Sequence, residues 1–374
     1  MILKKLRYYH ILLLGLLLAV KTADSQSPAE TPAATQVTLG KVKAIEFNEL
    51  PASTYSNEAM KWEEAVKLNK SDENAWLNLY KSKRYESYTE HSRKINKDKQ
   101  KELDEIITKM NESVPNSFGY HYAKYLNGAK SDESFNHLKA AFQINPNEPE
   151  LFDDMLCDAV IRNNAQDIKT YAEKVSTTGL YNAAEVEYNR NVLNSIEQNG
   201  VLLTYGNVDT YPIIMMQQLQ NFRKDVTVVC LEWLNNGVYK RQVAQLLNIP
   251  EKSVAYEKIL AANTGRGVYV GLTLPPDMIR KNGGKLYCTG LTMKYSEVPL
   301  QNLESLAYNW EFLFAKNKIN TNDQINKNYL LPLVLLKEYY TQNGKGEEAS
   351  VVQQSALQIA ERFSANNVIK KYID

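Results

Sequence analysis

The chain has 374 residues, a formal net charge of +1 at pH 7, and 44% hydrophobic residues. Its length predicts about two or three domains, and its hydrophobic fraction is typical of a packed globular protein rather than a disordered one. A net charge so close to zero provides no long-range field for nucleic acid or an acidic substrate, so we expect no nucleic-acid partner.

Residues 1–25 are typical of an export signal. A basic beginning precedes an apolar stretch at residues 11–20, shorter than the roughly 20 residues of a membrane span. Small residues before Gln26 predict cleavage there. We therefore expect an exported chain, periplasmic or associated with the outer membrane, that is not an integral membrane protein after cleavage. An uncleaved N-terminal anchor is the alternative.

Export would place the three cysteines in an oxidising compartment. They are Cys157, Cys230 and Cys288, and the odd number leaves at least one thiol without a disulfide partner. Cys230 and Cys288 stand in apolar, strand-like runs, which favours buried small hydrophobic residues over a disulfide or a reactive thiol.

Residues 26–57 are expected to be a linker and lead-in, because residues 26–36 are rich in Pro, Ala, Thr and Ser. The weak alternation at residues 37–50 indicates either a short strand or an ordered lead-in. Residues 58–198 follow with apolar residues at helical spacing, which predicts a helical domain.

An internal repeat runs through this helical domain. The stretch AVKLN at residues 65–69 is echoed by AFQIN at residues 141–145, and Trp76 is echoed by Phe152. The offset, 141 − 65 = 76, is close to two tetratricopeptide periods of about 34 residues plus an insertion. The domain thus resembles a degenerate tetratricopeptide array, whose concave face would bind a partner protein. A plain helical bundle without a groove is the alternative.

Apolar runs then alternate with helical stretches, which predicts a parallel α/β domain at residues 199–299. Its four strands are expected at residues 201–205, 226–231, 267–272 and 286–295. A helical hairpin region at residues 300–374 closes the chain. The expected fold class is therefore α plus α/β: a tetratricopeptide-like helical array, a small parallel-sheet domain and a closing helical hairpin.

Polar residues follow the expected strands, where ligands bind in open parallel sheets. The candidate ligand-binding residues are Asn207, Asp209, Thr210, Glu232, Asn235 and Thr273. Carboxylates and amides among aromatic residues would suit a glycan, and free amides at the start of the next helix would suit a small anion.

Structural interpretations compete with this site. Asp209 has the residue type and place of a helix N-cap, and Asn207 suits a tight turn beside Gly206. Asp209 with Glu232 could also form an acid/base pair, but no nucleophile or cofactor loop accompanies them.

The four histidines lack metal-ligand spacing, and no Walker loop, G-x-S-x-G or H-E-x-x-H motif occurs. We therefore expect no cofactor, no metal and no catalytic residue, and these absences favour a protein that is not an enzyme without deciding the question.

Residues 204–212, TYGNVDTYP, resemble the TNGDNDTFP signature of large multi-pass Bacteroidota membrane proteins of the glycosyltransferase-like, or protein O-mannosyltransferase-like, family. The similarity extends over residues 201–363, about two-fifths of the chain. It is carried further by Arg223-Lys224-Asp225-Val226, Leu234-Asn235, Tyr239, Tyr269, Thr273, Gly290-Leu291 and Val298-Pro299.

Two departures limit what this resemblance implies. Asn207 and Val208 stand where the family pattern has Asp and Asn, and no multi-pass part occurs in these 374 residues. The resemblance implies an exported relative of the family's soluble module and does not imply transferase activity. We expect a non-enzymatic interaction protein of the cell envelope that binds a partner envelope protein. The alternative is a glycan- or small-anion-binding module, or a degenerate glycosyltransferase-associated domain, that uses residues 207–210.

Overall fold

The computed structural model describes residues 40–45, 49–90, 95–262, 265–314, 323–363, 365 and 369–370. The expected signal and most of the expected tether lie outside the described residues. The described chain divides into two compact units. One, the helical unit, holds residues up to 180 together with 235–239; the other, the sheet unit, holds residues 181–234 and those from 240 onward. We expected the helical domain to run to residue 198, so this division places a further helix with the sheet.

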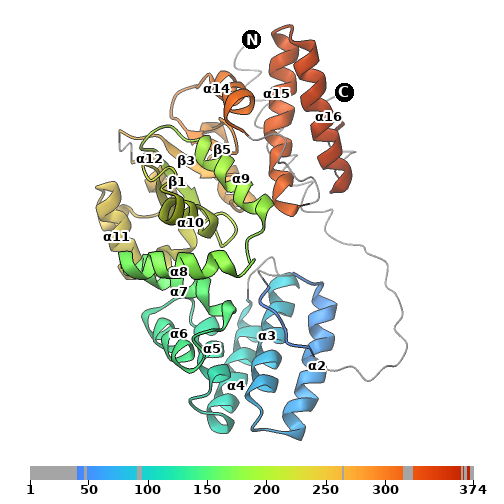
Figure 1. The fold of residues 1–374 in the computed structure, drawn as a ribbon, viewed down its shortest axis with the longest axis vertical. Helices are drawn as coiled ribbons and strands as arrows, with labels where there is room; N and C mark the ends of the chain where they lie inside the picture. Colours follow the sequence, from blue (N-terminus) through green and yellow to red (C-terminus); the bar gives the residue numbers. More distant parts are fainter. Residues whose placement is uncertain are drawn as a thin grey trace. The chain divides into compact units, whose positions relative to one another are not determined.

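The helical unit is a succession of helices (Figure 1). They are α2 (Ala52–Leu68), α3 (Glu73–Glu90), α4 (Lys97–Ser113), α5 (Phe118–Asn127), α6 (Asp132–Ile144), η1 (Pro149–Leu151), α7 (Phe152–Ile161) and α8 (Ala165–Thr177). Three pairs pack closely as hairpins, namely α2 with α3, α5 with α6, and α7 with α8.

The repeat read from the sequence recurs in the backbone. Helix α2 ends at Leu68 and α6 ends at Ile144, and each is followed by an asparagine C-cap. Asn69 has φ −143° and ψ 95°, and Asn145 has φ −133° and ψ 85°. The repeat is imperfect, because α2 packs on the helix that follows it, whereas α6 packs chiefly on the helix before it.

The sheet unit contains a five-stranded mixed sheet in the order β2-β1-β3-β5-β4. The strands are β1 (Val201–Thr204), β2 (Thr227–Cys230), β3 (Val268–Gly271), β4 (Leu286–Cys288) and β5 (Thr292–Tyr295). Strands β2, β1 and β3 are parallel, as expected, and all four residues of β1 are buried. A strand buried on both faces needs a continuous apolar run, which explains why the sequence signal was clear here.

The remaining segments of this part of the chain are mostly short helices. They are α9 (Ala183–Asn194), α10 (Tyr211–Gln220), η2 (Leu231–Asn235), α11 (Gly237–Leu247), η3 (Glu251–Ser253), α12 (Tyr256–Ala261), α13 (Pro276–Lys281), η4 (Gly283–Lys285), α14 (Asn302–Tyr308), η5 (Asn309–Leu313), η7 (Gln324–Tyr329), α15 (Leu330–Gln342) and α16 (Gly346–Arg362). The last two form the closing hairpin, with α16 burying Ala349, Val352, Ala356 and Ile359.

The single strand expected at residues 286–295 is two strands in the structure. Residues 286–295 form the antiparallel pair β4 and β5, joined by a tight turn in which Thr289 N–H donates to Thr292 O at 3.1 Å. Strand β5 then pairs antiparallel with β3. The sheet is therefore mixed, with a parallel half that carries the crossovers and an antiparallel hairpin at one edge.

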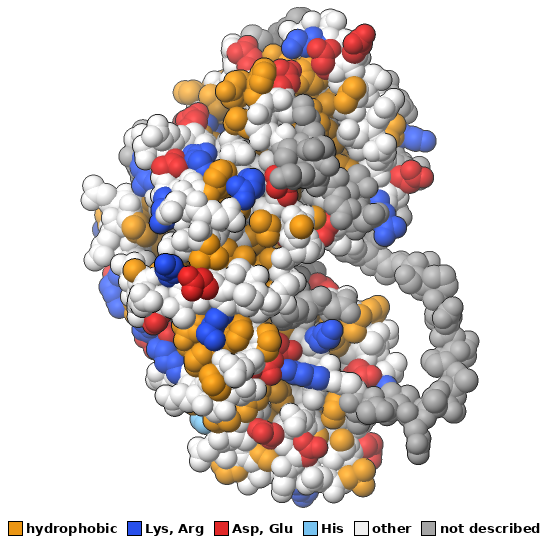
Figure 2. Space-filling model, in the orientation of Figure 1, with side chains coloured by type: hydrophobic (Ala, Val, Ile, Leu, Met, Phe, Trp, Pro, Cys, Tyr) orange, Lys and Arg blue, Asp and Glu red, His pale blue; other side chains and the backbone are white. Residues whose placement is uncertain are grey.

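None of the described helices is long and apolar enough to cross a membrane. On the face drawn in Figure 2, basic and acidic side chains lie intermixed among the coloured residues.

Candidate functional site

The strand order places a topological switch point at the carboxyl ends of β1 and β3, the position where open α/β sheets have a crevice. Strand β1 has β2 on one side and β3 on the other, so the chain changes direction of winding at β1. Ligands of open α/β sheets bind at such a switch point. The loop at residues 205–210 follows β1, and Thr273 lies just beyond β3. We call this place the switch-point crevice.

Asp209 occupies the switch-point crevice with its own carboxyl group. Its side chain is 3% exposed. Oδ2 accepts a hydrogen bond from Thr273 Oγ1 at 2.5 Å and another from Tyr205 N–H at 2.9 Å. The carboxyl thus joins the segment after β1 to the segment after β3 and spans the place where a ligand would enter.

Asp209 does not cap α10, contrary to the structural interpretation offered by the sequence. The N-cap residue is Thr210, which makes no side-chain capping bond. Instead, the main-chain carbonyl of Asn207 accepts from the amides of Thr210 and Tyr211, at 3.3 and 3.1 Å. The Asp209 carboxyl points back to the strand that precedes it rather than forward to the helix.

Hydroxyl groups continue this arrangement inside the unit. Thr210 Oγ1 lies 2.8 Å from Thr204 Oγ1 and 3.3 Å from Asp209 Oδ1. Thr204, the last residue of β1, is 1% exposed and was not among the residues predicted from the sequence. Its polar side chain at the end of an otherwise apolar run was the available signal.

Burial controls the electrostatics of the crevice. It raises the pKa of Asp209 to about 6, against the opposing effect of the hydrogen bonds from Thr273, Tyr205 and Thr210. Burial also raises the pKa of the neighbouring Cys230 thiol to about 12. At neutral pH Cys230 is therefore a protonated thiol and not a nucleophile.

The other predicted site residues differ in where they lie and in how exposed they are. Asn207 is half-buried within the loop, and Glu232 is exposed on η2. Asn235, the last residue of η2, is exposed and groups with the helical unit. The structure thus brings together Asp209, Thr210 and Thr273 from the predicted set, and adds Thr204.

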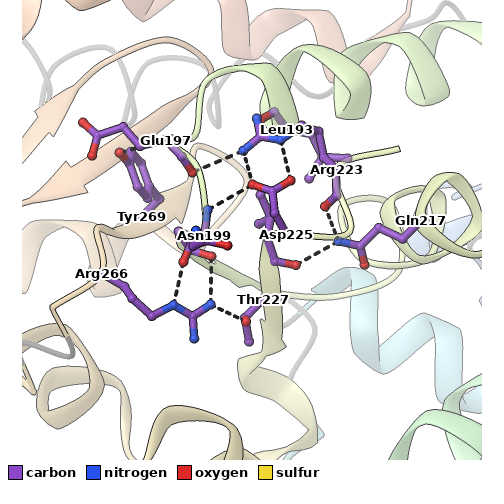
Figure 3. Close-up of polar contacts among 11 residues, drawn as sticks. Leu193, Glu197, Asn199, Gln217, Arg223, Asp225, Thr227, Arg266 and Tyr269 are labelled. Carbon is purple, nitrogen blue, oxygen red and sulfur yellow. Dashed lines mark hydrogen bonds and ion pairs between the residues drawn. The ribbon is translucent and has the colours of Figure 1, made fainter. Parts of the chain in front are cut away.

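A second polar cluster lies at the opposite, amino end of the parallel strands (Figure 3). Arg223 donates to Asp225 through two parallel contacts, Nε to Oδ1 at 2.9 Å and an Nη to Oδ2 at 2.8 Å. The same guanidinium donates to the carbonyls of Leu193 at 2.6 Å and Glu197 at 3.2 Å, at and beyond the end of α9. We call Arg223 and Asp225 the α9 clamp.

The α9 clamp extends to the starts of β1 and β3. Asp225 Oδ2 accepts from the Asn199 N–H at 3.0 Å, and Arg266 donates to the Asn199 carbonyl at 2.5 Å and to Thr227 Oγ1 (Figure 3). Arg223 lowers the pKa of Asp225 to about 2. The donors and acceptors named here all bond to other groups of the same chain. The cluster therefore stabilises the fold.

Cys157, Cys230 and Cys288 are all buried and none forms a disulfide. Among the described residues, no three His, Cys, Asp or Glu side chains gather as a metal site.

The comparisons with known proteins match one short region of the chain to a family model. Residues 185–255 match the family model described as TMEM260-associated domain 2. This region overlaps the resemblance drawn from the sequence and starts earlier, inside α9, the helix that Arg223 ties to the sheet. The search of curated proteins found no match. A structural search found the crystal structure of yeast Tom70, with 12% identity over 96% of this chain and 69% of that chain. Its TM-score of 0.30 does not establish a shared fold. Over residues 185–255, therefore, the chain is similar to TMEM260-associated domain 2.

Proposed function

We propose that this chain is an exported, non-enzymatic interaction protein whose helical unit binds a partner polypeptide of the cell envelope. One observation carries the proposal: the helical unit holds an extended segment of polypeptide by its main chain. Asn78 and Lys81 on α3 bind the amide and the carbonyl of Val42, at 2.8 and 3.3 Å. Stacked helical pairs form extended binding surfaces, and hydrogen bonds to the main chain give affinity for an extended peptide.

Exposed apolar residues on the helical unit offer candidate contact points for a partner. Leu68 and Ile144, at equivalent helix ends, are 89% and 49% exposed. We take these two exposed apolar side chains as the candidate contact points for the partner.

The glycan or anion alternative receives less support. A ligand in the switch-point crevice would have to break the hydrogen bond between Asp209 and Thr273. Each of these side chains already has the other as a hydrogen-bond partner. The exposed residues of that loop, Tyr205 and Val208, offer neither a carboxylate nor an amide, and the amide of Asn207 is half-buried.

A co-purification experiment tests the proposed function. The double variant Leu68→Glu with Ile144→Glu places charges on the helical unit without disturbing its core. Val351→Glu, at a position 59% exposed on α16, is the matched control. We expect the control to retain the partners of the unmodified chain and the double variant to bind them at least about tenfold more weakly. Equal recovery of the same partners by both variants would contradict the proposal.

A further inference from the structure

Residues 40–45, the lead-in segment, have no regular secondary structure and yet are held firmly. Val42, Ala44 and Ile45 are 7%, 6% and 5% exposed, whereas Lys41 and Lys43 are exposed. This alternation over the first residues is that of an extended chain lying on a surface, with every second side chain directed inward.

Two side chains of α3 recognise the lead-in segment by its backbone. Val42 N–H donates to Asn78 Oδ1 at 2.8 Å, and Lys81 Nζ donates to Val42 O at 3.3 Å. Asn78 is oriented for this task, because its own amide donates to Asn74 O at 2.8 Å and leaves Oδ1 toward the segment. Contacts with main-chain groups do not depend on the identity of residue 42, so another extended peptide could make them.

The charges around the lead-in segment select for a basic residue. Lys41 Nζ lies 2.9 Å from Glu148 Oε1 and 3.7 Å from Glu150 Oε1. Glu150 also pairs with Lys81, which is completely buried beside the Tyr122 ring. Without an occupant, Asn78 and Lys81 would each lose a buried hydrogen-bond partner, which makes an empty site unfavourable.

We propose that the lead-in segment is a tethered substitute for a partner's peptide, and that the partner presents an extended stretch with a basic residue followed by an aliphatic one. This inference rests on the proposed function of the helical unit and names the class of its partner. Asn78 and Lys81 hold the peptide's main chain, Glu148 and Glu150 hold its basic side chain, and the alternate apolar residues are buried. The lead-in segment competes for the same place and keeps the buried polar groups satisfied in the absence of the partner.

The test uses the full chain with the substitution Val42→Pro. Proline has no N–H, so the variant loses the bond to Asn78 and releases the lead-in segment while the α3 residues stay intact. Lys43→Ala, at the exposed neighbouring position, is the matched control. The probe is a fluorescent peptide with blocked ends and the sequence of residues 40–45, GKVKAI. The negative probe is the same peptide with an N-methylated valine.

We expect the probe to bind Val42→Pro at least about tenfold more tightly than the unmodified chain or the control, because a tethered competitor acts at millimolar effective concentration. We also expect the N-methylated peptide to lose this binding, and Glu148→Gln in the released variant to weaken the probe but not a peptide with alanine in place of its first lysine.

Two results would overturn the inference. One is a cooperatively melting Val42→Pro chain that fails to bind the probe or binds the N-methylated peptide equally well. The other is loss of the melting transition in Val42→Pro, since the segment would then be part of the core. If these occur while the Leu68 and Ile144 double variant still loses its partners, the proposed function stands and only the peptide class is wrong.

Discussion

A buried carboxyl with a raised pKa makes Asp209 a residue whose contribution to stability depends on pH. Its pKa is about 6 in the folded chain, against 3.8 for the ordinary carboxyl. The folded state therefore binds the proton more tightly than the unfolded state does. The stability that this provides is complete below pH 4 and is lost as the pH rises through 6.

Asp209→Asn should remove this dependence. An amide keeps an oxygen to accept from Thr273 and Tyr205 but cannot ionise. We expect the unmodified chain to lose up to about 3 kcal/mol between pH 4 and pH 7 relative to this variant, as measured by urea unfolding. Parallel unfolding free energies of the two chains over this range would show that Asp209 does not titrate inside the fold.

Thr273→Val tests the contact that closes the switch-point crevice. The substitution keeps the shape and removes the hydroxyl that donates to Asp209 Oδ2 at 2.5 Å. We expect a loss of about 1 to 2 kcal/mol at pH 7 and a further rise in the pKa of Asp209, because that hydroxyl favours the ionised carboxyl. An unchanged melting temperature would contradict a closed crevice.

The residues of the crevice were partly predictable for a physical reason. Asp209 and Thr273 were identified because polar residues after apolar runs mark the carboxyl ends of strands. Their direct bond was not predictable, because it depends on the register of β1 against β3, which no local pattern specifies. The interpretation of Asp209 as a helix N-cap was also wrong. Its residue type and position allow a cap, but its carboxyl instead binds groups that the tertiary fold brings near it.

At the scale of elements, the α9 clamp explains why α9 belongs with the sheet. Arg223 has φ +47°, a left-handed conformation that costs an arginine about 1 kcal/mol or more. Its bonds to Asp225 and to the carbonyls of Leu193 and Glu197 offset this cost.

Arg223→Ala should therefore loosen α9 specifically. We expect a loss of about 2 kcal/mol in unfolding free energy and faster hydrogen exchange at the amides of α9 than at those of β1. Lys224→Ala, at the exposed adjacent position, is the control. Uniformly faster exchange across the sheet unit would indicate a general loss of stability instead.

Asp225 provides the opposite pH dependence from Asp209. Arg223 holds its pKa near 2, so its contribution is present above pH 4 and is lost as the pH falls toward 2. The side chain is partly exposed, which limits the effect to about 1 kcal/mol. Asp225→Asn should flatten the stability profile below pH 4 and leave the range from pH 4 to pH 7 unchanged.

The β4–β5 hairpin shows where strand prediction from sequence stops. The run at residues 286–295 is apolar enough for one strand, and the turn is marked only by Thr289 and Gly290. A side chain on Gly290 would approach Ser195 Oγ to 2.2 Å, so the glycine is required by a residue far away in the sequence. The three parallel strands and the closing hairpin were predictable because continuous apolar runs and helical spacing are both local signals.

For the whole molecule, the sequence predicts cleavage of an export signal as well as the fold. If residues 1–25 are an export signal, the chain recovered from its native cells should begin at Gln26 and fractionate with the periplasm or the outer membrane. N-terminal sequencing of the recovered chain checks this directly. A chain that retains Met1 and fractionates with the cytoplasm would contradict export.

We propose that the helical unit binds a partner, whereas the switch-point crevice of the sheet unit is closed by its own side chains. Photo-crosslinking in cells distinguishes the two surfaces, with a photoreactive amino acid placed singly at Leu68, Ile144 or Val208. All three positions are exposed and apolar, so the first two report on the helical unit and the third on the rim of the switch-point crevice. We expect crosslinked protein adducts at Leu68 and Ile144 and none at Val208. Adducts at Val208 alone would contradict this proposal.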